Sequence, residues 1–287
     1  MNLMGRAMSF LIFASAVCII FFAGNCTAGL LDIVDQVEKS GGKSGTLRGG
    51  GDDAANAEEL EYDLESALGD HISLEGFRRY GLPVDDPDLQ RYVNLVGNSL
   101  VRQSDRADIP FYFVVVESSL YSSFASTGGI VFITSEFMKS MKNESELAGV
   151  LAHEISHINR KHLLQSASRA GLGGEMPFEE IMSKFYSILF SRGLESDLEF
   201  EADQLGMNIV YGTGYDPGGF ISAMKTLQNV RGAAKKEGAW FSTHPPLAER
   251  IRKCRIHLKY ISDISMEESA GDRFSEYKNR LLEAVPK

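Results

Sequence analysis

Residues 151–162 read Leu-Ala-His-Glu-Ile-Ser-His-Ile-Asn-Arg-Lys-His, and this stretch decides how the rest of the chain is interpreted. On a helix, His153 and His157 lie one turn apart on the same face, so both imidazoles can reach one metal ion. Glu154 is rotated by about 100° from that face and can lie beside the ion without binding it. A general base for a metal-activated water belongs at that position. The spacing therefore predicts a helix that carries a metal site.

A catalytic zinc ion has three protein ligands, so a third must come from elsewhere in the chain. On a continuous helix His162 points about 140° away from the ligand face, and it is interpreted as a surface histidine. A second predicted helix, 198–210, places Glu199 and Asp203 one turn apart. Glu199 can bind zinc, and Asp203 can accept the second imidazole N–H of a liganding histidine. Spacing alone leaves Glu201 as a rival, and leaves open a solvated acidic face.

The composition excludes several classes of protein. The chain has 287 residues, which is one generous domain or two small ones and is enough to bury a core. It has 29 basic and 39 acidic residues, and its net charge of −10 argues against nucleic acid as a partner. Three cysteines exclude a disulfide-rich scaffold.

The N-terminal part differs from the rest of the chain. Residues 1–28 have the anatomy of a secretory signal peptide, with one basic residue, an apolar run over 10–23 and small residues after it. The run is shorter than the roughly 20 residues of a membrane-spanning helix, yet an uncleaved anchor and lipidation at Cys26 both stay open. Residues 29–56 are rich in Gly and Ser and predict a flexible linker. Residues 57–287 are expected to form the folded domain.

Apolar patterns and breakers order the elements of this domain. We expect helices from Ala57 and again after the start signal Asp86-Pro87. Three strands are predicted, over residues 111–117, 123–125 and 129–134. The chain after them is mostly helical. Its apolar segment 175–190 is expected to pack between helices, to cover a cleft, or to form a surface that touches membrane or unfolded clients. The predicted fold class is α+β, mainly helical with a small mixed β-sheet.

At this point the sequence resembles a known family. The His-Glu-Ile-Ser-His motif, followed about forty residues later by Glu199-Phe-Glu-Ala-Asp203, is similar to the HtpX and CAAX-prenyl-protease group of gluzincin zinc metallopeptidases. The layout of the chain resembles that of exported bacterial members of the BepA and LoiP kind. Gly214-Tyr-Asp-Pro217, Thr243-His244-Pro245 and Arg250 also match the family pattern, and the resemblance runs from about Pro110 to about Arg255.

The resemblance implies a zincin-type fold that binds one zinc ion per chain through His153, His157 and Glu199. It also implies peptide hydrolysis, with Glu154 as the general base. His244 is expected either to donate to the developing oxyanion or to occupy the fourth zinc position and hold the enzyme off. The expected substrate-binding residues are those of a cleft-edge strand and one arginine: Gly129, Ile130, Val131 and Arg250.

The predicted function is that of a periplasmic zinc-dependent endopeptidase acting on misfolded or misassembled envelope proteins. Its expected partners are those protein substrates, with the outer-membrane assembly machinery as a further partner and no nucleic acid. The alternative is a zinc-stabilised chaperone or assembly factor for outer-membrane proteins, with weak or gated proteolysis. An intact Glu154 favours catalysis, because a structural zinc site needs no base and is usually closed by four ligands.

Overall fold

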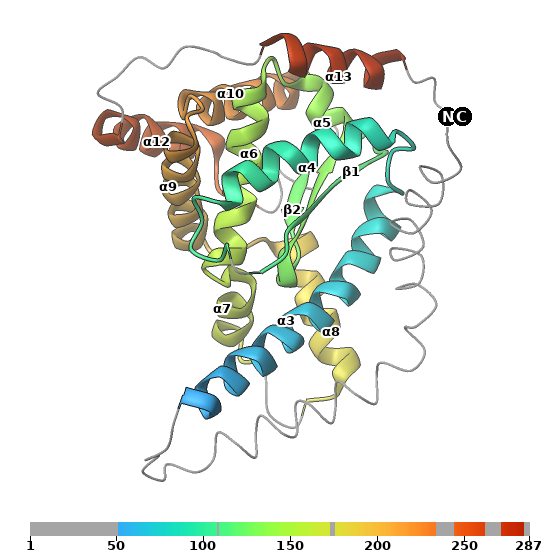
Figure 1. The fold of residues 1–287 in the computed structure, drawn as a ribbon, viewed down its shortest axis with the longest axis vertical. Helices are drawn as coiled ribbons and strands as arrows, with labels where there is room; N and C mark the ends of the chain where they lie inside the picture. The colour runs from blue at the N-terminus through green and yellow to red at the C-terminus, as the bar shows by residue number, and fades with distance from the viewer. Residues whose placement is uncertain (1–50, 108, 173–175, 234–243, 262–270, 284–287) are drawn as a thin grey trace.

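A computed structural model describes residues 51–107, 109–172, 176–233, 244–261 and 271–283 (Figure 1). The expected signal peptide over 1–28 and the linker up to residue 50 lie outside these ranges. Helix α3 (Gly51–Tyr80) begins before Ala57, so the predicted boundary between linker and domain falls inside a helix. Among the described residues, no helix combines the length and the apolar character that a membrane span requires.

The fold is mainly helical around one small sheet, as predicted. After α3 the helices are α4 (Pro87–Val101), α5 (Ser135–Ser140), α6 (Glu144–Asn159), α7 (His162–Arg169), α8 (Phe178–Ser187), α9 (Ser196–Thr213), α10 (Gly218–Ala233), α12 (Leu247–Ile261) and α13 (Gly271–Glu283). A π-helical turn, η2 (Ile188–Arg192), follows α8. The predicted helix start at Asp86-Pro87 is confirmed, because the Asp86 side chain accepts hydrogen bonds from the N–H groups of Asp88 and Leu89.

The sheet has the strand order β1-β3-β2, with β1 (Tyr112–Val116) parallel to β3 (Ile130–Thr134) and β2 (Ser123–Ala125) antiparallel to it. The predicted mixed sheet is therefore confirmed. The expectation that the strand over 129–134 forms the edge is wrong, because β3 pairs on both sides. The turn through Gly128, at φ 76°, folds β3 back beside β2 and leaves β2 on the outside.

Each face of the sheet has its own core. The side chains alternate along the strands, as the period of two requires. One face joins α4, α6, α9 and α10 in the larger core through Phe113, Val115, Val131 and Ile133. The other face packs Phe124 and Phe132 against α3 and α8, which lie together on one side of the sheet in Figure 1. Residues 176–190 thus contribute to packing between helices, as expected.

The outer edge of β1 is closed by side chains of α4. Gln90 accepts from Val115 N–H at 2.9 Å and donates to Val115 C=O at 2.8 Å. One helical turn later, Asn94 accepts from Phe113 N–H at 3.0 Å and donates to Phe113 C=O at 2.6 Å. These two amide side chains, together with backbone bonds from Val84 N–H to Val115 C=O at 2.9 Å and from Glu117 N–H to Leu82 C=O at 2.8 Å, satisfy an edge that would otherwise be open to pairing.

The start of α6 is anchored by a buried carboxylate. Glu144 accepts hydrogen bonds from Tyr92 Oη and Tyr215 Oη, each at 2.6 Å. Arg273 of α13 donates to the same carboxylate from Nε at 2.8 Å and also from Nη2. One side chain therefore connects α4, α13 and the turn after α9 to the beginning of α6.

We expect Glu144→Gln to lower the free energy of unfolding by about 1–3 kcal/mol at pH 7, because Arg273 loses its charged acceptor. Burial raises the pKa of Glu144, but hydrogen bonds from Arg273, Tyr215 and Tyr92 outweigh it, so the pKa in the folded state lies below 4.5. Such a carboxyl stabilises the fold above its unfolded-state pKa, and this contribution disappears as the pH falls through the folded-state value.

In urea unfolding, the difference in free energy of unfolding between the wild type and E144Q should therefore become smaller as the pH falls below about 4.5. Glu249→Gln is the control, because Glu249 is an exposed acidic residue in the first turn of α12. That variant should stay within about 0.5 kcal/mol of the wild type. A difference for E144Q that stays constant down to pH 3.5 would contradict the proposed role of the Glu144 charge.

Candidate metal centre

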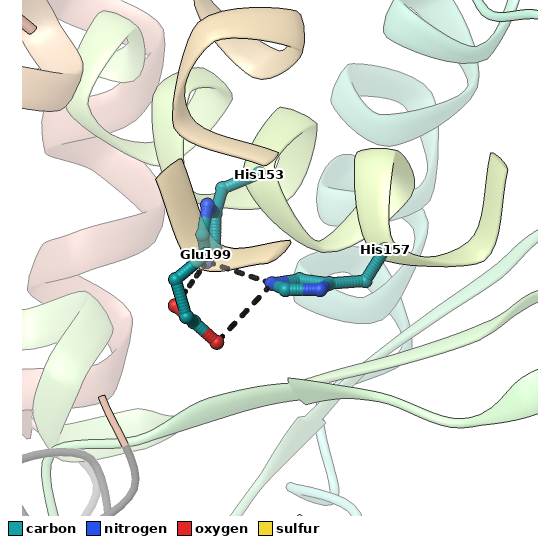
Figure 2. A group of neighbouring side chains, drawn as sticks. All are labelled: His153, His157 and Glu199. Carbon is teal, nitrogen blue, oxygen red and sulfur yellow. Dashed lines mark hydrogen bonds and ion pairs between the residues drawn. The ribbon is translucent and has the colours of Figure 1, made fainter. Parts of the chain in front are cut away.

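Helix α6 carries both histidines of the motif. Its first turn is capped by Asn143, whose side chain accepts a hydrogen bond from Glu146 N–H at 3.0 Å. His153 and His157 are buried, and their Nε2 atoms lie 3.1 Å apart (Figure 2). The predicted placement of both rings on one helix face is therefore confirmed.

Helix α9 crosses close to α6 at a glycine. A Cβ atom on Gly206 would lie 2.9 Å from the backbone N of His153, closer than packed atoms normally approach. Ala202, one turn earlier on α9, is also fully buried. This close crossing places Glu199 and Asp203 against the rings of α6.

Glu199, and not its rival Glu201, faces the two histidines. Its carboxylate oxygens lie 3.6 Å from His153 Nε2 and 3.7 Å from His157 Nε2. In the part of the chain that the structure describes, these three residues form the group whose potential ligand atoms all lie within 4.8 Å of one another (Figure 2). Glu201 is 47% exposed and lies 3.3 Å from Arg160 Nε.

The chemistry of this group fits a divalent metal ion. Two imidazole nitrogens and one carboxylate oxygen are donors that divalent transition metals accept. Burial raises the pKa of Glu199 well above its usual range, and its Oε2 has no hydrogen-bond donor among the described residues. When ionised, the three buried carboxylates of Glu154, Glu199 and Asp203 carry a charge of −3, and the buried Arg250 carries +1, so a net charge of −2 remains. A divalent cation would balance that excess.

Asp203 holds His153 from the other side of its ring. Its Oδ1 lies 3.1 Å from His153 Nδ1, the contact that the sequence predicted. Burial alone would raise the pKa of Asp203, but the charge of Arg250 and hydrogen bonds from Arg250 and His153 lower it well below its usual value. An ionised Asp203 keeps the proton of His153 on Nδ1 and leaves Nε2 free to bind a metal ion.

Arg250 lies behind the metal site and not in the cleft. It donates to Asp203 from Nε at 3.0 Å and from Nη2 at 2.5 Å, and its Nη1 is 3.6 Å from Glu199 Oε2. Its residue exposure is 0%, which corrects the expectation that it binds substrate. The sequence held a signal for this position, because Arg250 falls on the apolar stripe of α12 formed by Leu247, Ile251 and Cys254.

Glu154 and His244 line one pocket with His157 and Glu199. Glu154 is 2% exposed, and burial raises the pKa of its carboxyl. His244 Nε2 lies 3.6 Å from Glu199 Oε2, so the structure brings His244 to the group, as expected. Its neighbour Thr243 lies outside the described residues.

The comparisons with known proteins agree with this geometry. A model described as peptidase family M48 matches residues 87–257. The chain belongs to peptidase family M48. That match spans both histidines of α6, Glu199 on α9, His244 and Arg250. The expected resemblance to the gluzincin metallopeptidases is therefore confirmed at the level of the family.

Bacterial and mitochondrial proteins are similar to this M48 chain. The beta-barrel assembly-enhancing protease of Yersinia pestis is 28% identical over 252 residues, which cover 81% of this chain and 49% of that protein. The protease of the same name from Escherichia coli K12 is 25% identical, over 73% of this chain and 47% of its own. The mitochondrial metalloendopeptidase OMA1 of Schizosaccharomyces pombe is 25% identical, over 76% of this chain and 67% of that protein. The chain thus spans about half the length of the two bacterial relatives.

The pocket of the M48 domain is bordered by β2 and not by β3. Residues 122–127, which include all of β2, line it together with Leu189 and Leu194 from the segment after α8. Gly129, Ile130 and Val131 do not line it; Ile130 pairs with β1, and Val131 pairs with both β1 and β2. The expectation that these three residues bind substrate is corrected, because sheet order cannot be read from the order of strands along the chain.

The expectation that His162 is a surface histidine is also wrong. Its exposure is 0%, and its Nδ1 lies 3.0 Å from His157 Nδ1. The helix does not continue as assumed: α6 ends at Asn159, and Lys161 adopts a left-handed conformation with φ 52°. This turn brings His162 back beside the ring of His157. Burial lowers the pKa of His162 to about 4, so it is neutral near pH 7 and its Nδ1 can accept a hydrogen bond from Nδ1–H of His157.

We expect His162→Ala to weaken metal binding by about 10–100-fold, because a partner on the outer nitrogen fixes the orientation of a liganding ring. Competition of Zn²⁺ and Co²⁺ between the protein and a chromophoric chelator measures the affinity. His257→Ala is the control, since His257 lies on α12 and contacts Asn208 at 2.9 Å. Equal affinities of H162A and the wild type would show that the contact with His157 does not support the ligand.

Proposed function

We propose that this M48 chain is a zinc-dependent endopeptidase that hydrolyses peptide bonds in misfolded or misassembled envelope proteins. The observation that carries the proposal is the convergence of His153, His157 and Glu199 beside a pocket that His157, Glu199 and Glu154 line. A base beside an incomplete ligand set is the arrangement of a catalytic metal site, whereas a structural site is closed by four protein ligands.

Zinc is the metal that this ligand set favours, because two imidazoles and one carboxylate with an open fourth position are typical of zinc peptidases. We propose one ion per chain, held by His153, His157 and Glu199. When bound, zinc polarises the scissile carbonyl and lowers the pKa of a coordinated water. Asp203 and His162 hold the two histidine rings so that each Nε2 points into the site.

Glu154 is proposed as the general base. It takes the proton of the attacking water and delivers it to the amine that leaves. His244 lies at the same pocket and has two possible roles. It would donate to the oxyanion that develops on the substrate, or it would ligate the bound metal in place of water and hold the enzyme off.

Substrates are proposed to bind as extended backbone along β2. Among the described residues, β2 has no strand partner on the side away from β3, and it lines the pocket. Strand addition at such an edge gives affinity through main-chain hydrogen bonds. An extended segment is available in misfolded or misassembled proteins and is not available in well-folded ones, so this mode of binding favours such clients.

The location and the partners are proposed from the sequence and the relatives. The signal-like residues 1–28 support export to the periplasm, with an uncleaved anchor or a lipid on Cys26 as alternatives. The bacterial relatives carry the name beta-barrel assembly-enhancing protease. We therefore propose outer-membrane assembly as the setting of the reaction. The chaperone alternative is not favoured, because the relatives named above are all called proteases or metalloendopeptidases.

We expect the zinc-loaded chain to cleave unfolded casein, and Glu154→Gln to lower the rate by about 10²–10⁴-fold. The variant should still bind about one zinc ion per chain, because Glu154 is not a ligand in the proposal. Removing the metal with 1,10-phenanthroline should abolish cleavage, and added Zn²⁺ should restore it. Full cleavage by E154Q would refute the proposed mechanism.

His244→Ala in the same assay separates the two roles of His244. Loss of an oxyanion donor lowers kcat by about tenfold or more and leaves zinc affinity unchanged. Removal of a group that occupies the open position raises the rate instead. If neither the wild type nor H244A cleaves casein while both bind zinc and unfolded protein, the peptidase proposal is wrong.

A further inference from the structure

The carboxylate of Glu154 is held by the strand that borders the pocket. Ser123 Oγ donates a hydrogen bond to Glu154 Oε1 at 2.7 Å, and the backbone of Ala125 bonds to the same carboxylate. Ser123 and Glu154 are each 2% exposed. Both donors come from β2, and neither was singled out by the sequence.

The register of the sheet explains why these donors point at Glu154. Ser122 C=O accepts from Thr134 N–H at 2.9 Å, and Ser126 N–H donates to Ile130 C=O at 2.8 Å, so both face β3. In an antiparallel pair alternate residues turn their backbone groups the other way. Residues 123 and 125 therefore direct their backbone away from β3.

Alternation also sets the side chains of the strand. Phe124 packs in the core on the α3 side of the sheet, whereas Ala125 belongs to the core that contains α6. The side chain of Ser123, two residues before Ala125, consequently faces α6 and reaches Glu154.

We infer that Ser123 is a positioning residue for Glu154, an inference that rests on the proposed role of Glu154 as the base. The last torsion of a glutamate side chain is broad, so a carboxylate without a fixed partner samples many orientations. Ser123 fixes Oε1, so the carboxylate meets the attacking water in one orientation.

This link also connects substrate and base. The backbone of β2 is the proposed partner of the substrate, and the side chain of Ser123 on the same strand holds Glu154. A displacement of about 1 Å between reacting groups can lower a rate by about a hundredfold. Placing both functions on one residue keeps the base in register with the scissile bond.

The test compares Ser123→Ala with Ser123→Thr in a steady-state assay on a fluorogenic peptide. S123A should lower kcat by about tenfold and leave KM within twofold, since the hydroxyl acts on the base and not on substrate affinity. S123T keeps a hydroxyl and should recover most of the rate. Ser135→Ala is the control for loss of a buried serine. The hydroxyl of Ser135 forms hydrogen bonds of 3.2 Å with the backbone of Ser118, and Ser135 does not line the pocket.

Two further measurements show whether Ser123 acts through Glu154. In a double-mutant cycle, S123A should change the residual rate of E154Q less than twofold, because the base is already absent. Zinc affinity of S123A should equal that of the wild type. In a crystal structure of S123A, the Glu154 carboxylate should occupy more than one orientation.

The outcomes are distinct. Provided that E154Q is inactive, three outcomes would overturn the inference. S123A could keep the kcat of the wild type, it could lower the rate of E154Q by the same factor as that of the wild type, or it could lose zinc affinity in proportion to kcat. Full activity of E154Q would instead overturn the proposed function, and the inference with it. Thermal melts of S123A and S123T separate a folding defect from a positioning defect. If S123A does not fold, Ser123→Cys replaces it, because a thiol has nearly the size of the hydroxyl and is only a weak donor; wild-type kcat in S123C would overturn the inference.

Discussion

The close crossing of α6 and α9 is the constraint on which the site depends. Because Gly206 has no side chain, the two backbones approach until a Cβ atom would collide with His153 N. Only at that separation do the carboxylates of Glu199 and Asp203 reach the rings of α6. The same approach removes water from several charged groups, which is unfavourable unless opposite charges compensate. Arg250 supplies part of that compensation, and a divalent cation would supply the rest.

The part of the site that follows helix periodicity could be predicted from the sequence. His153, Glu154 and His157 lie on one helix, so their relative directions follow from a fixed angle per residue. Asp203 follows Glu199 by one turn for the same reason. The same reasoning gave the wrong position for His162, because the chain leaves the helix at the left-handed Lys161 and no glycine or proline in the sequence marks that break. The prediction for Arg250 was wrong because the sequence does not distinguish a buried arginine from an exposed one when its partners lie on another helix.

The positions of the strands along the chain could be predicted, but their order in the sheet could not. The strands over 112–116, 123–125 and 130–134 follow from β-branched and aromatic residues and from the Thr-Gly-Gly turn. Their order in the sheet depends on long-range pairing, here a parallel contact between β1 and β3. Hairpin partners are recognisable from a turn, whereas a parallel neighbour leaves no local signal. The cleft edge was therefore assigned to the wrong strand.

The two edges of this sheet are treated in opposite ways, and the difference bears on function. An open edge pairs with any extended chain, so proteins usually close it. Gln90 and Asn94 close the outer side of β1 with four hydrogen bonds. The described residues supply no such side-chain ladder to β2: the backbone of Ala125 bonds to Glu154, and no described strand pairs with the outer side of β2. In the proposed mode of substrate binding, closing β1 leaves strand addition to β2, where a bound backbone would lie beside the metal ligands.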